Sequence, residues 1–354
     1  MPRVALTPAM RRLTAMSALE PQGAVTSLPI DYDKRLMLFS GRATRQLGMN
    51  IADKLGVDLS PTKLKTFSNG EVYCRYLESI RGADVFIVQS TCGNADEGLT
   101  ANDSLLELLV MIDAAVGASA HRVIAVVPWF GYSRQDKKSA PREPISARLV
   151  ARMIEAAGAD RVLTMDLHAG QVQGFFSKPV DHMTARFILA QHFNDLHIEN
   201  LVVVAPDVGR AKLAQKFAEN VGAELAVMIK DRPDQQQAEI GYVIGEVHGK
   251  NAIIVDDIID TAGTLRAATA TLREQGVERV FAAATHGVFS GAAFENIAAT
   301  PLEQVVVTDT IPLRSDAPAI LRQLPCADML TDSIRRIFTD GSVSEVFAGE
   351  NQLF

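Results

Sequence analysis

One short segment combines acids, hydroxyls and a glycine in an order that could hold a sugar phosphate. The strand expected at Ala252–Val255 leads into Asp256 and Asp257, and Asp260–Thr264 follows as Asp-Thr-Ala-Gly-Thr. A helix should begin near Leu265, so amides at its start, the threonine hydroxyls and the helix dipole could surround a phosphate. The carboxylates could accept hydrogen bonds from ribose hydroxyls. A helix cap would explain any one element, but the full order favours a sugar-phosphate loop.

Charged and polar side chains also follow several other expected strands. They are Arg134 with Gln135, His168, Asp207, and Lys230 with Arg232. A guanidinium can bind two phosphate oxygens at once, and a glutamine amide offers both a donor and an acceptor. A carboxylate is the hard oxygen ligand that Mg²⁺ prefers. A lone histidine is more often structural than functional, and His168 is one of seven. No Gly-Lys-Ser/Thr loop is present, which excludes a P-loop kinase.

The order of expected elements indicates an α/β fold with mainly parallel sheets. Short runs rich in Val and Ile alternate with helical patterns from Lys34 onward. Strands are expected at Arg35–Phe39, Asp84–Gln89, Arg122–Val127, Arg161–Met165, Leu201–Ala205, Leu225–Ile229, Ala252–Val255, Val280–Ala284 and Gln304–Val307. Continuous apolar strands are typical of parallel sheets with both faces covered. A helix through Leu47, Ile51 and Leu55 should end near Gly56.

Size and composition limit the class of protein. The 354 residues are 47% hydrophobic and 22% charged, as expected for a soluble protein of two ordinary domains. No apolar run reaches the roughly 18–20 residues that span a bilayer. A net charge of −7 argues against a general nucleic-acid binder. Cys74, Cys92 and Cys326 fit neither a disulfide framework nor a C-x-x-C metal site, so a reducing compartment is expected.

Residues 1–32 differ from the rest of the chain. Three arginines precede the first acid, Glu20, and four prolines interrupt any long helix. A disordered N-terminal extension is the main expectation, and an organelle-targeting peptide is the alternative.

Six ordered segments resemble the ribose-phosphate pyrophosphokinase family. They are Phe67–Glu71, Gly131–Asp136, Thr164–Ala169, Gln173–Phe176, Pro206–Gly209 and the sugar-phosphate loop within Asp256–Thr264. That loop alone resembles the phosphoribosyl-pyrophosphate loop of the type I phosphoribosyltransferase fold, whereas the six segments together resemble enzymes that make phosphoribosyl pyrophosphate. The resemblance runs from Lys34 to Phe354 and leaves only the N-terminal extension outside it.

This resemblance implies an α/β fold of two similar phosphoribosyltransferase-like domains, each with a mainly parallel central sheet flanked by helices. The N-terminal, ATP-binding domain is expected at residues 33–182. The C-terminal domain, which binds ribose 5-phosphate, is expected at residues 183–340, and residues 341–354 should form a tail that packs on the N-terminal domain.

The resemblance also assigns functional residues at matching positions. ATP binding is expected at Asn69, Gly70, Glu71, Arg134 and Gln135, and ribose 5-phosphate binding at Arg232, Asp256, Asp260, Thr261, Ala262, Gly263 and Thr264. Lys230 and Arg232 are the implied catalytic residues, on a mobile loop that closes over the reaction. His168 and Asp207 are the implied metal contacts, with a water molecule between the histidine and its Mg²⁺.

The implied reaction is attack of the C1 hydroxyl of ribose 5-phosphate on the β-phosphorus of ATP, which transfers pyrophosphate and releases AMP. With it come two Mg²⁺ sites, ATP as co-substrate and inorganic phosphate as activator. A homohexamer in the cytoplasm, with no nucleic-acid or membrane partner, is also implied. The alternatives are a catalytically silent regulatory homologue and a phosphoribosyltransferase that joins a base to the sugar. The segments at Asn69–Glu71 and Arg134–Gln135 favour the synthetase over the transferase.

Two positions depart from the family pattern. Asp231 separates Lys230 from Arg232 where a further basic residue is common, and Arg210 follows Gly209 where a second glycine is common. Both departures concern loop geometry and leave the reaction class unchanged.

Replacing Lys230 with alanine tests its implied catalytic role. We expect turnover to fall about 10²- to 10⁴-fold with nucleotide binding largely kept, because a positive charge near the transferred group acts mainly in the transition state. Steady-state rates and nucleotide titrations on one preparation measure both quantities. Near-normal turnover in the folded variant would remove Lys230 from the catalytic residues.

Overall fold

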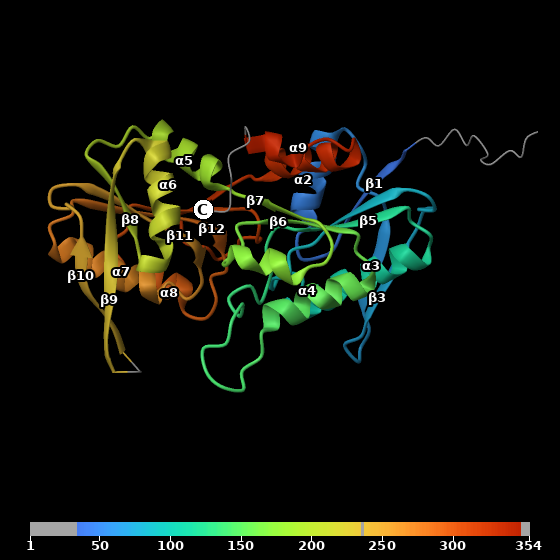
Figure 1. The fold of residues 1–354 in the computed structure, drawn as a ribbon, viewed down its shortest axis with the longest axis horizontal. Coiled ribbons are helices and arrows are strands. Elements are labelled where there is room, and N and C mark those ends of the chain that lie inside the picture. The colour runs from blue at the N-terminus through green and yellow to red at the C-terminus, as the bar shows by residue number, and fades with distance from the viewer. Residues whose placement is uncertain (1–33, 235–236, 348–354) are drawn as a thin grey trace, which may run out of the picture. The chain divides into compact units, whose positions relative to one another are not determined.

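Two mainly parallel sheets organise the chain from Arg35 onward in a computed structural model of the protein (Figure 1). The structure describes residues 34–234 and 237–347, and of these the side chains of 230–241 and 347 lie outside the description. The extension predicted at residues 1–32 and the end of the predicted tail, residues 348–354, therefore lie outside the described residues.

The first sheet has five parallel strands in the order β1-β4-β5-β6-β7. They are β1 (Leu36–Ser40), β4 (Asp84–Val88), β5 (Arg122–Val127), β6 (Arg161–Met165) and β7 (Val180–Met183). Helices α3 (Ala101–Gly117) and α4 (Ser146–Ala157) cover one face. Helix α2 (Arg45–Leu55) covers the other face and packs against α9 (Ala327–Phe338). A separate hairpin, β2 (Thr62–Thr66) and β3 (Val72–Tyr76), packs on α3.

The second sheet has seven strands in the order β10-β9-β8-β11-β12-β13-β14, and only the outer pair β9/β10 is antiparallel. They are β8 (Leu201–Ala205), β9 (Glu224–Asp234), β10 (Gln237–Ile244), β11 (Asn251–Ile259), β12 (Arg279–Gly287), β13 (Gln304–Thr308) and β14 (Leu321–Leu324). Helices α5 (Arg186–Asp195) and α6 (Ala211–Val221) cover one face. Helices α7 (Gly263–Glu274) and α8 (Ala293–Ala298) cover the other. Short 3₁₀ helices η2 (Gly170–Phe175), η3 (Val208–Arg210) and η4 (Val343–Phe347) complete the described elements.

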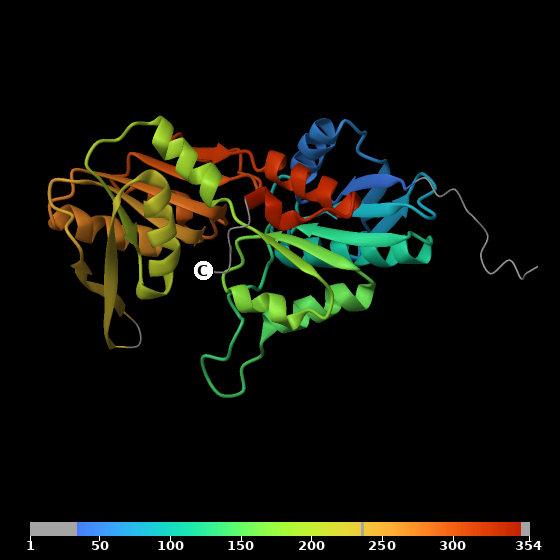
Figure 2. The same ribbon diagram turned by 45° about the horizontal axis from the view of Figure 1, so that its top comes forward.

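One hydrophobic core runs across both sheets on the face that carries α2, α5, α6 and α9. Buried side chains such as Ile51 of α2, Phe193 of α5, Phe217 of α6 and Ile334 of α9 belong to this single cluster. Figure 2 shows α5 and α9 along the same side of the molecule. The last strand of the first sheet is β7, which ends close to the domain boundary predicted between residues 182 and 183. The boundary itself stays a prediction.

Polar contacts hold the loop after β6 against the second sheet. Asp166 has φ 34°, a backbone conformation that non-glycine residues rarely adopt. One of its carboxylate oxygens accepts hydrogen bonds from the backbone N–H of Ala185 at 2.8 Å and from the hydroxyl of Thr285 at 2.6 Å. Nε2 of buried His286 lies 3.1 Å from the carbonyl oxygen of Met165. These contacts fix the start of the loop that carries His168.

All nine predicted strands are present, and the α/β fold class is confirmed. The predicted helix through Leu47 is α2, which ends at Leu55 and is followed by Gly56 in the left-handed conformation. Several strands are longer than predicted. Strand β11 continues to Ile259, so Asp256 and Asp257 lie within it rather than after it.

No helix in residues 34–234 or 237–347 is both long enough and apolar enough to cross a membrane.

Replacement of Thr285 by valine tests the contact between the two sheets. The variant keeps the side-chain shape but removes a donor from the Asp166 carboxylate, so we expect the free energy of unfolding to fall by about 1.5–3 kcal/mol. Urea unfolding measures this change.

Thr271→Val is the matched control, because its hydroxyl donates to the carbonyl oxygen of Ala267 one turn earlier in α7 and joins no second element. A local bond of this kind adds little to a helix, so this variant should change stability by less than about 0.5 kcal/mol. Equal stability of the two variants would show that the bond between Thr285 and Asp166 contributes nothing.

Candidate functional site

A cavity of about 250 Å³ lies at the carboxyl ends of β8 and β11. The two halves of the chain both line it, through Arg134, His168, Asp207, Arg210, Asp256, Asp257 and the run Asp260–Thr264. Ligands of open parallel sheets bind outside the carboxyl ends of the strands. The cavity thus brings together most of the residues that the sequence singled out.

The start of α7 forms one wall of this cavity. Ala262 precedes the helix in the left-handed conformation, with φ 58°, and no described side chain caps the first amides of the helix. Thr261, Gly263 and Thr264 are exposed to solvent around it. An uncapped helix start next to a left-handed residue presents several N–H groups to one point, which suits a phosphate. A non-glycine residue held at positive φ is a strain typical of functional loops.

Two carboxylates of β11 form the floor of the cavity. Oδ1 of Asp256 accepts a hydrogen bond of 2.8 Å from the backbone N–H of Asp257. Oδ2 of Asp257 lies 2.8 Å from Nδ1 of His168, and its side chain is only 5% exposed. Arg210 reaches both acids, with Nε 3.2 Å from Asp256 and a terminal nitrogen 3.3 Å from Asp257. Arg210 and His168 therefore offset the negative charge of Asp256 and Asp257.

The pKa values of Asp256 and Asp257 are shifted in opposite directions. Enclosure in the protein and the neighbouring charge of Asp257 raise the pKa of Asp256 well above its ordinary value. Burial by itself would raise the pKa of Asp257, but the hydrogen bonds with His168 and Asp256 and the charge of Arg210 together lower it. Neighbouring carboxylates whose pKa values are shifted in opposite directions are common at functional sites.

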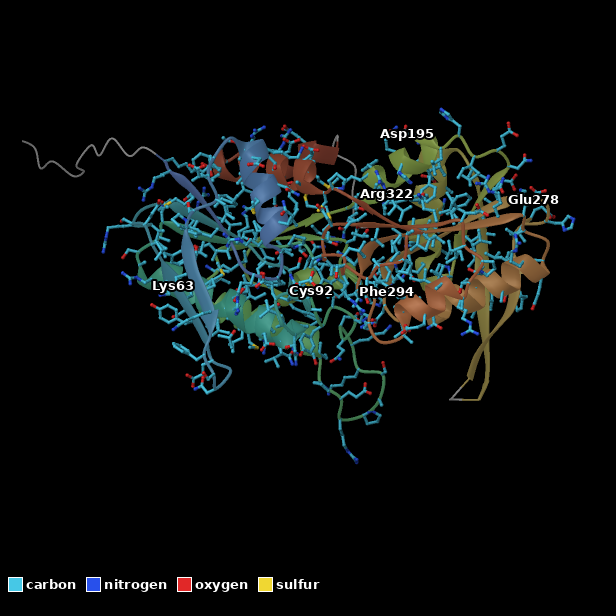
Figure 3. The ribbon with its side chains drawn as sticks, turned by 180° about the vertical axis from the view of Figure 1, so that it is seen from behind. Lys63, Cys92, Asp195, Glu278, Phe294 and Arg322 are labelled. Carbon is cyan, nitrogen blue, oxygen red and sulfur yellow. The ribbon has the colours of Figure 1, made fainter. Side chains whose placement is uncertain are left out.

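Asp260 links this cavity to a second one. Its Oδ2 accepts a hydrogen bond of 2.6 Å from half-exposed Arg134, and its Oδ1 accepts one from the hydroxyl of Ser290. Arg134, Gln135 and Ser290 also line the second cavity, of about 520 Å³, together with Cys92 and Arg314. Figure 3 labels Cys92, from the first half of the chain, and Phe294, from the second half, near the middle of the view. The guanidinium of Arg314 lies over the ring of Phe294.

The turn predicted to hold ATP lies elsewhere. Asn69, Gly70 and Glu71 form an exposed turn between β2 and β3, where the Asn69 side chain accepts a hydrogen bond from the backbone of Glu71. Neither cavity lined by Arg134 contains any of these three described residues. Within one chain, the structure does not bring the two predicted parts of the ATP site into one cavity.

The segment with Lys230 and Arg232 differs from the expected loop. Strand β9 continues through both residues to Asp234 and pairs with β10, with Lys230 opposite Ile240. Figure 1 shows this pair running beyond the neighbouring strands. The side chains of Lys230, Asp231 and Arg232 lie outside the described residues, so their roles stay predictions.

Potential metal ligands do not cluster among the described residues. No group of three or more His, Cys, Asp or Glu side chains converges there. Asp207 lies in the cavity wall, and its Oδ1 accepts a hydrogen bond of 3.2 Å from the backbone N–H of Arg210. Mg²⁺ commonly takes one or two carboxylates and completes its shell with substrate phosphates and water. Asp207 fits that pattern, whereas the ring nitrogens of His168 already contact Asp257 and Arg210.

Three residues of the site were not among the predicted site residues. Asp257 was considered as an acceptor for ribose hydroxyls but was not among the predicted site residues, and Arg210 was noted only as a departure from a family pattern. Ser290 follows β12 and carries no signal in the sequence that points to Asp260.

Two family models match the chain. The N-terminal domain of ribose phosphate pyrophosphokinase matches residues 36–158, and the phosphoribosyl synthetase-associated domain matches residues 240–348. Together they cover more than half of the chain.

Relatives of known sequence and structure are similar along most of the chain. A ribose-phosphate pyrophosphokinase from Chlorobaculum tepidum is 45% identical over 317 residues, which cover 89% of this chain and 96% of that protein. One from Neisseria meningitidis is 46% identical over 322 residues, with 90% and 96% coverage. The crystal structure of phosphoribosylpyrophosphate synthetase from Mycobacterium smegmatis matches with a TM-score of 0.79 at 43% identity, and covers 87% of this chain and 100% of that one.

Replacing Asp257 with asparagine tests the electrostatics of the cavity floor. We expect the pKa of Asp256 to fall, because the neighbouring charge is lost, but to stay above its ordinary value, because enclosure remains. Between the two midpoints, Asp256 is protonated in the parent protein and ionised in the variant. Carboxyl ¹³C NMR of aspartate-labelled protein follows the titration.

Asp309 serves as an internal control, since its pKa is also raised by burial and it lies outside this cavity. A midpoint for Asp256 that is unchanged or higher in the variant would contradict the assignment.

Proposed function

The chain belongs to the ribose-phosphate pyrophosphokinase family, and we propose that the cavity at the ends of β8 and β11 is where it carries out the reaction. It is an enzyme that transfers the pyrophosphoryl group of ATP to ribose 5-phosphate in nucleotide biosynthesis. Neither alternative is favoured. The named relatives are similar over about nine-tenths of the chain, and the family models reach both halves.

Ribose 5-phosphate binds, in this proposal, with its phosphate at the start of α7 and its hydroxyls toward β11. The observation that carries the assignment is the uncapped helix start at Ala262, which shares one cavity with Asp256 and Asp260. Phosphate oxygens would accept hydrogen bonds from amides of residues 261–264 and from the Thr261 and Thr264 hydroxyls. Ribose hydroxyls would donate to Asp256 and Asp260. Arg232 contributes to the same substrate from the β9/β10 pair.

ATP binds beside this site through Arg134 and Gln135. Arg134 faces both cavities and already touches Asp260, so a nucleotide held by Arg134 lies next to the sugar acceptor. The exposed turn Asn69–Glu71 lies outside both cavities and would complete the ATP site of a neighbouring copy. Such sharing requires an oligomer, and the family resemblance implies a homohexamer.

The reaction forms a bond between the C1 oxygen of ribose 5-phosphate and the β-phosphorus of ATP. The bond from that phosphorus to the oxygen bridging it to the α-phosphorus breaks, AMP leaves with that oxygen, and the hydroxyl proton goes to solvent. Lys230 and Arg232 offset negative charge on the moving group, and Asp256 and Asp260 orient the acceptor.

Asp207 would hold Mg²⁺ at the diphosphate, and His168 would help to hold the ion that accompanies ATP. When bound, Mg²⁺ supplies positive charge to the phosphate oxygens. Inorganic phosphate as activator and a cytoplasmic location, where both substrates are available, complete the proposal.

Thr264→Val tests the sugar-phosphate assignment. The substitution removes one hydroxyl donor and keeps the backbone amide, so we expect KM for ribose 5-phosphate to rise about 10- to 100-fold. The KM for ATP should change less than about twofold, because the nucleotide lies on the Arg134 side. Initial rates of AMP release, with each substrate varied in turn, separate the two constants.

Thr271→Val, about two turns further along α7 and outside the cavity, is the matched control and should leave both constants unchanged. An unchanged KM for ribose 5-phosphate in folded Thr264→Val would move the phosphate away from the start of α7.

A further inference from the structure

Arg210 places a permanent positive charge inside the proposed catalytic cavity. It ends the short helix η3 and leads into α6, and its side chain is only 15% exposed. Its backbone N–H is held by Asp207, so the side chain starts from a fixed point in the cavity wall. A guanidinium stays protonated at any pH that the protein tolerates.

All three guanidinium nitrogens are engaged. Nε lies 3.2 Å from Asp256, and one terminal nitrogen lies 3.3 Å from Asp257. The other terminal nitrogen donates to the carbonyl oxygen of His168 at 3.3 Å. Arg210 thus spans from the second half of the chain to the loop after β6.

The same guanidinium lies against both nitrogens of the His168 ring. The terminal nitrogen that contacts Asp257 is also 2.8 Å from Nδ1 and 3.2 Å from Nε2. These two ring atoms are the ones through which a histidine can hold a metal ion or a metal-bound water. The positively charged guanidinium of Arg210 therefore already lies beside the ring nitrogens of His168.

The floor of the cavity needs a cation for electrostatic reasons. Asp257 is buried, and Asp256 is its immediate neighbour in β11. Two adjacent carboxylates with little access to water are costly unless a cation lies beside them. A divalent ion or a guanidinium can meet that need, and the two would repel one another at about 3–4 Å.

We propose that Arg210 is a tethered cation that occupies the position between His168, Asp256 and Asp257 in the substrate-free protein, and that it keeps a free divalent ion from binding there. The inference rests on the proposed function for the identity of the cavity. Divalent ions would then enter with the phosphates of the substrates, which can draw the guanidinium away from the acids. Arg210 is a positioning residue in this account, because it acts through the acids and His168.

Mn²⁺ binding to the substrate-free, full-length protein tests the proposal. The electron paramagnetic resonance signal of free Mn²⁺ reports how much ion the protein removes from solution. Arg210→Met keeps an unbranched, flexible side chain and removes the charge and the guanidinium donors. We expect this variant to gain one Mn²⁺ site per chain that is about 10- to 1000-fold tighter than any in this cavity of the parent protein.

Two further variants identify the cause. Arg210→Lys retains a charge, so its Mn²⁺ binding should stay close to that of the parent. Combining Arg210→Met with Asp257→Asn also removes a carboxylate beside the position that the guanidinium leaves, and should abolish the gain. Arg279→Met, a half-exposed arginine beside Glu303 on the same sheet, is the matched control and should leave Mn²⁺ binding unchanged.

A second readout covers a variant of low stability. An ion that binds only the folded state raises the unfolding temperature, so Mn²⁺ should stabilise Arg210→Met more than it stabilises the parent. Equal Mn²⁺ binding and equal thermal shifts in parent and variant would overturn the proposal, and so would a gain that survives the Asp257→Asn substitution. Neither readout involves turnover. A failure here is therefore distinguishable from a failure of the proposed function, which the KM values test.

Discussion

The site depends on how the protein compensates two adjacent carboxylates at the end of β11. Asp256 and Asp257 come from the second half of the chain, and the imidazole that contacts Asp257 comes from the first. Arg210 completes the set from a third segment. Because neither acid can lie at the cavity floor at low cost without these partners, the loop after β6 and the start of α6 must stay in place around β11.

The rest of the fold supplies that constraint. A hydrophobic core continues across both sheets beneath α2, α5, α6 and α9, so the sheets are packed on common side chains. Asp166, strained and bound to Thr285, anchors the loop that carries His168 to the second sheet. Asp260 plays a similar part on the other side of the cavity, where it joins Arg134 to Ser290. The side chains that line the two cavities are therefore linked to one another in position.

The strands and the sugar-phosphate loop were predictable where their residues are contiguous in the sequence. Strands such as β4 and β5 are buried on both faces, so their runs of Val and Ile were sufficient. Among the described residues, strands β2, β3, β7, β10 and β14 were missed. Val180–Met183 and Leu321–Leu324, for example, mix polar and apolar residues, as strands at the edge of a sheet can. The sugar-phosphate loop was predictable because its acids, hydroxyls and helix start are contiguous. Arg210 and Ser290 were not, because their partners are distant in sequence and only tertiary structure brings them together.

The central claim is that this cavity transfers pyrophosphate intact from ATP to the C1 oxygen of ribose 5-phosphate. The most direct measurement is ³¹P NMR of the folded protein with ATP, Mg²⁺ and ribose 5-phosphate as the only other reactants. The account predicts that AMP and a sugar 1-diphosphate appear in equal amounts as ATP disappears. Formation of ADP with a sugar 1-monophosphate, or no loss of ATP with and without inorganic phosphate, would contradict it.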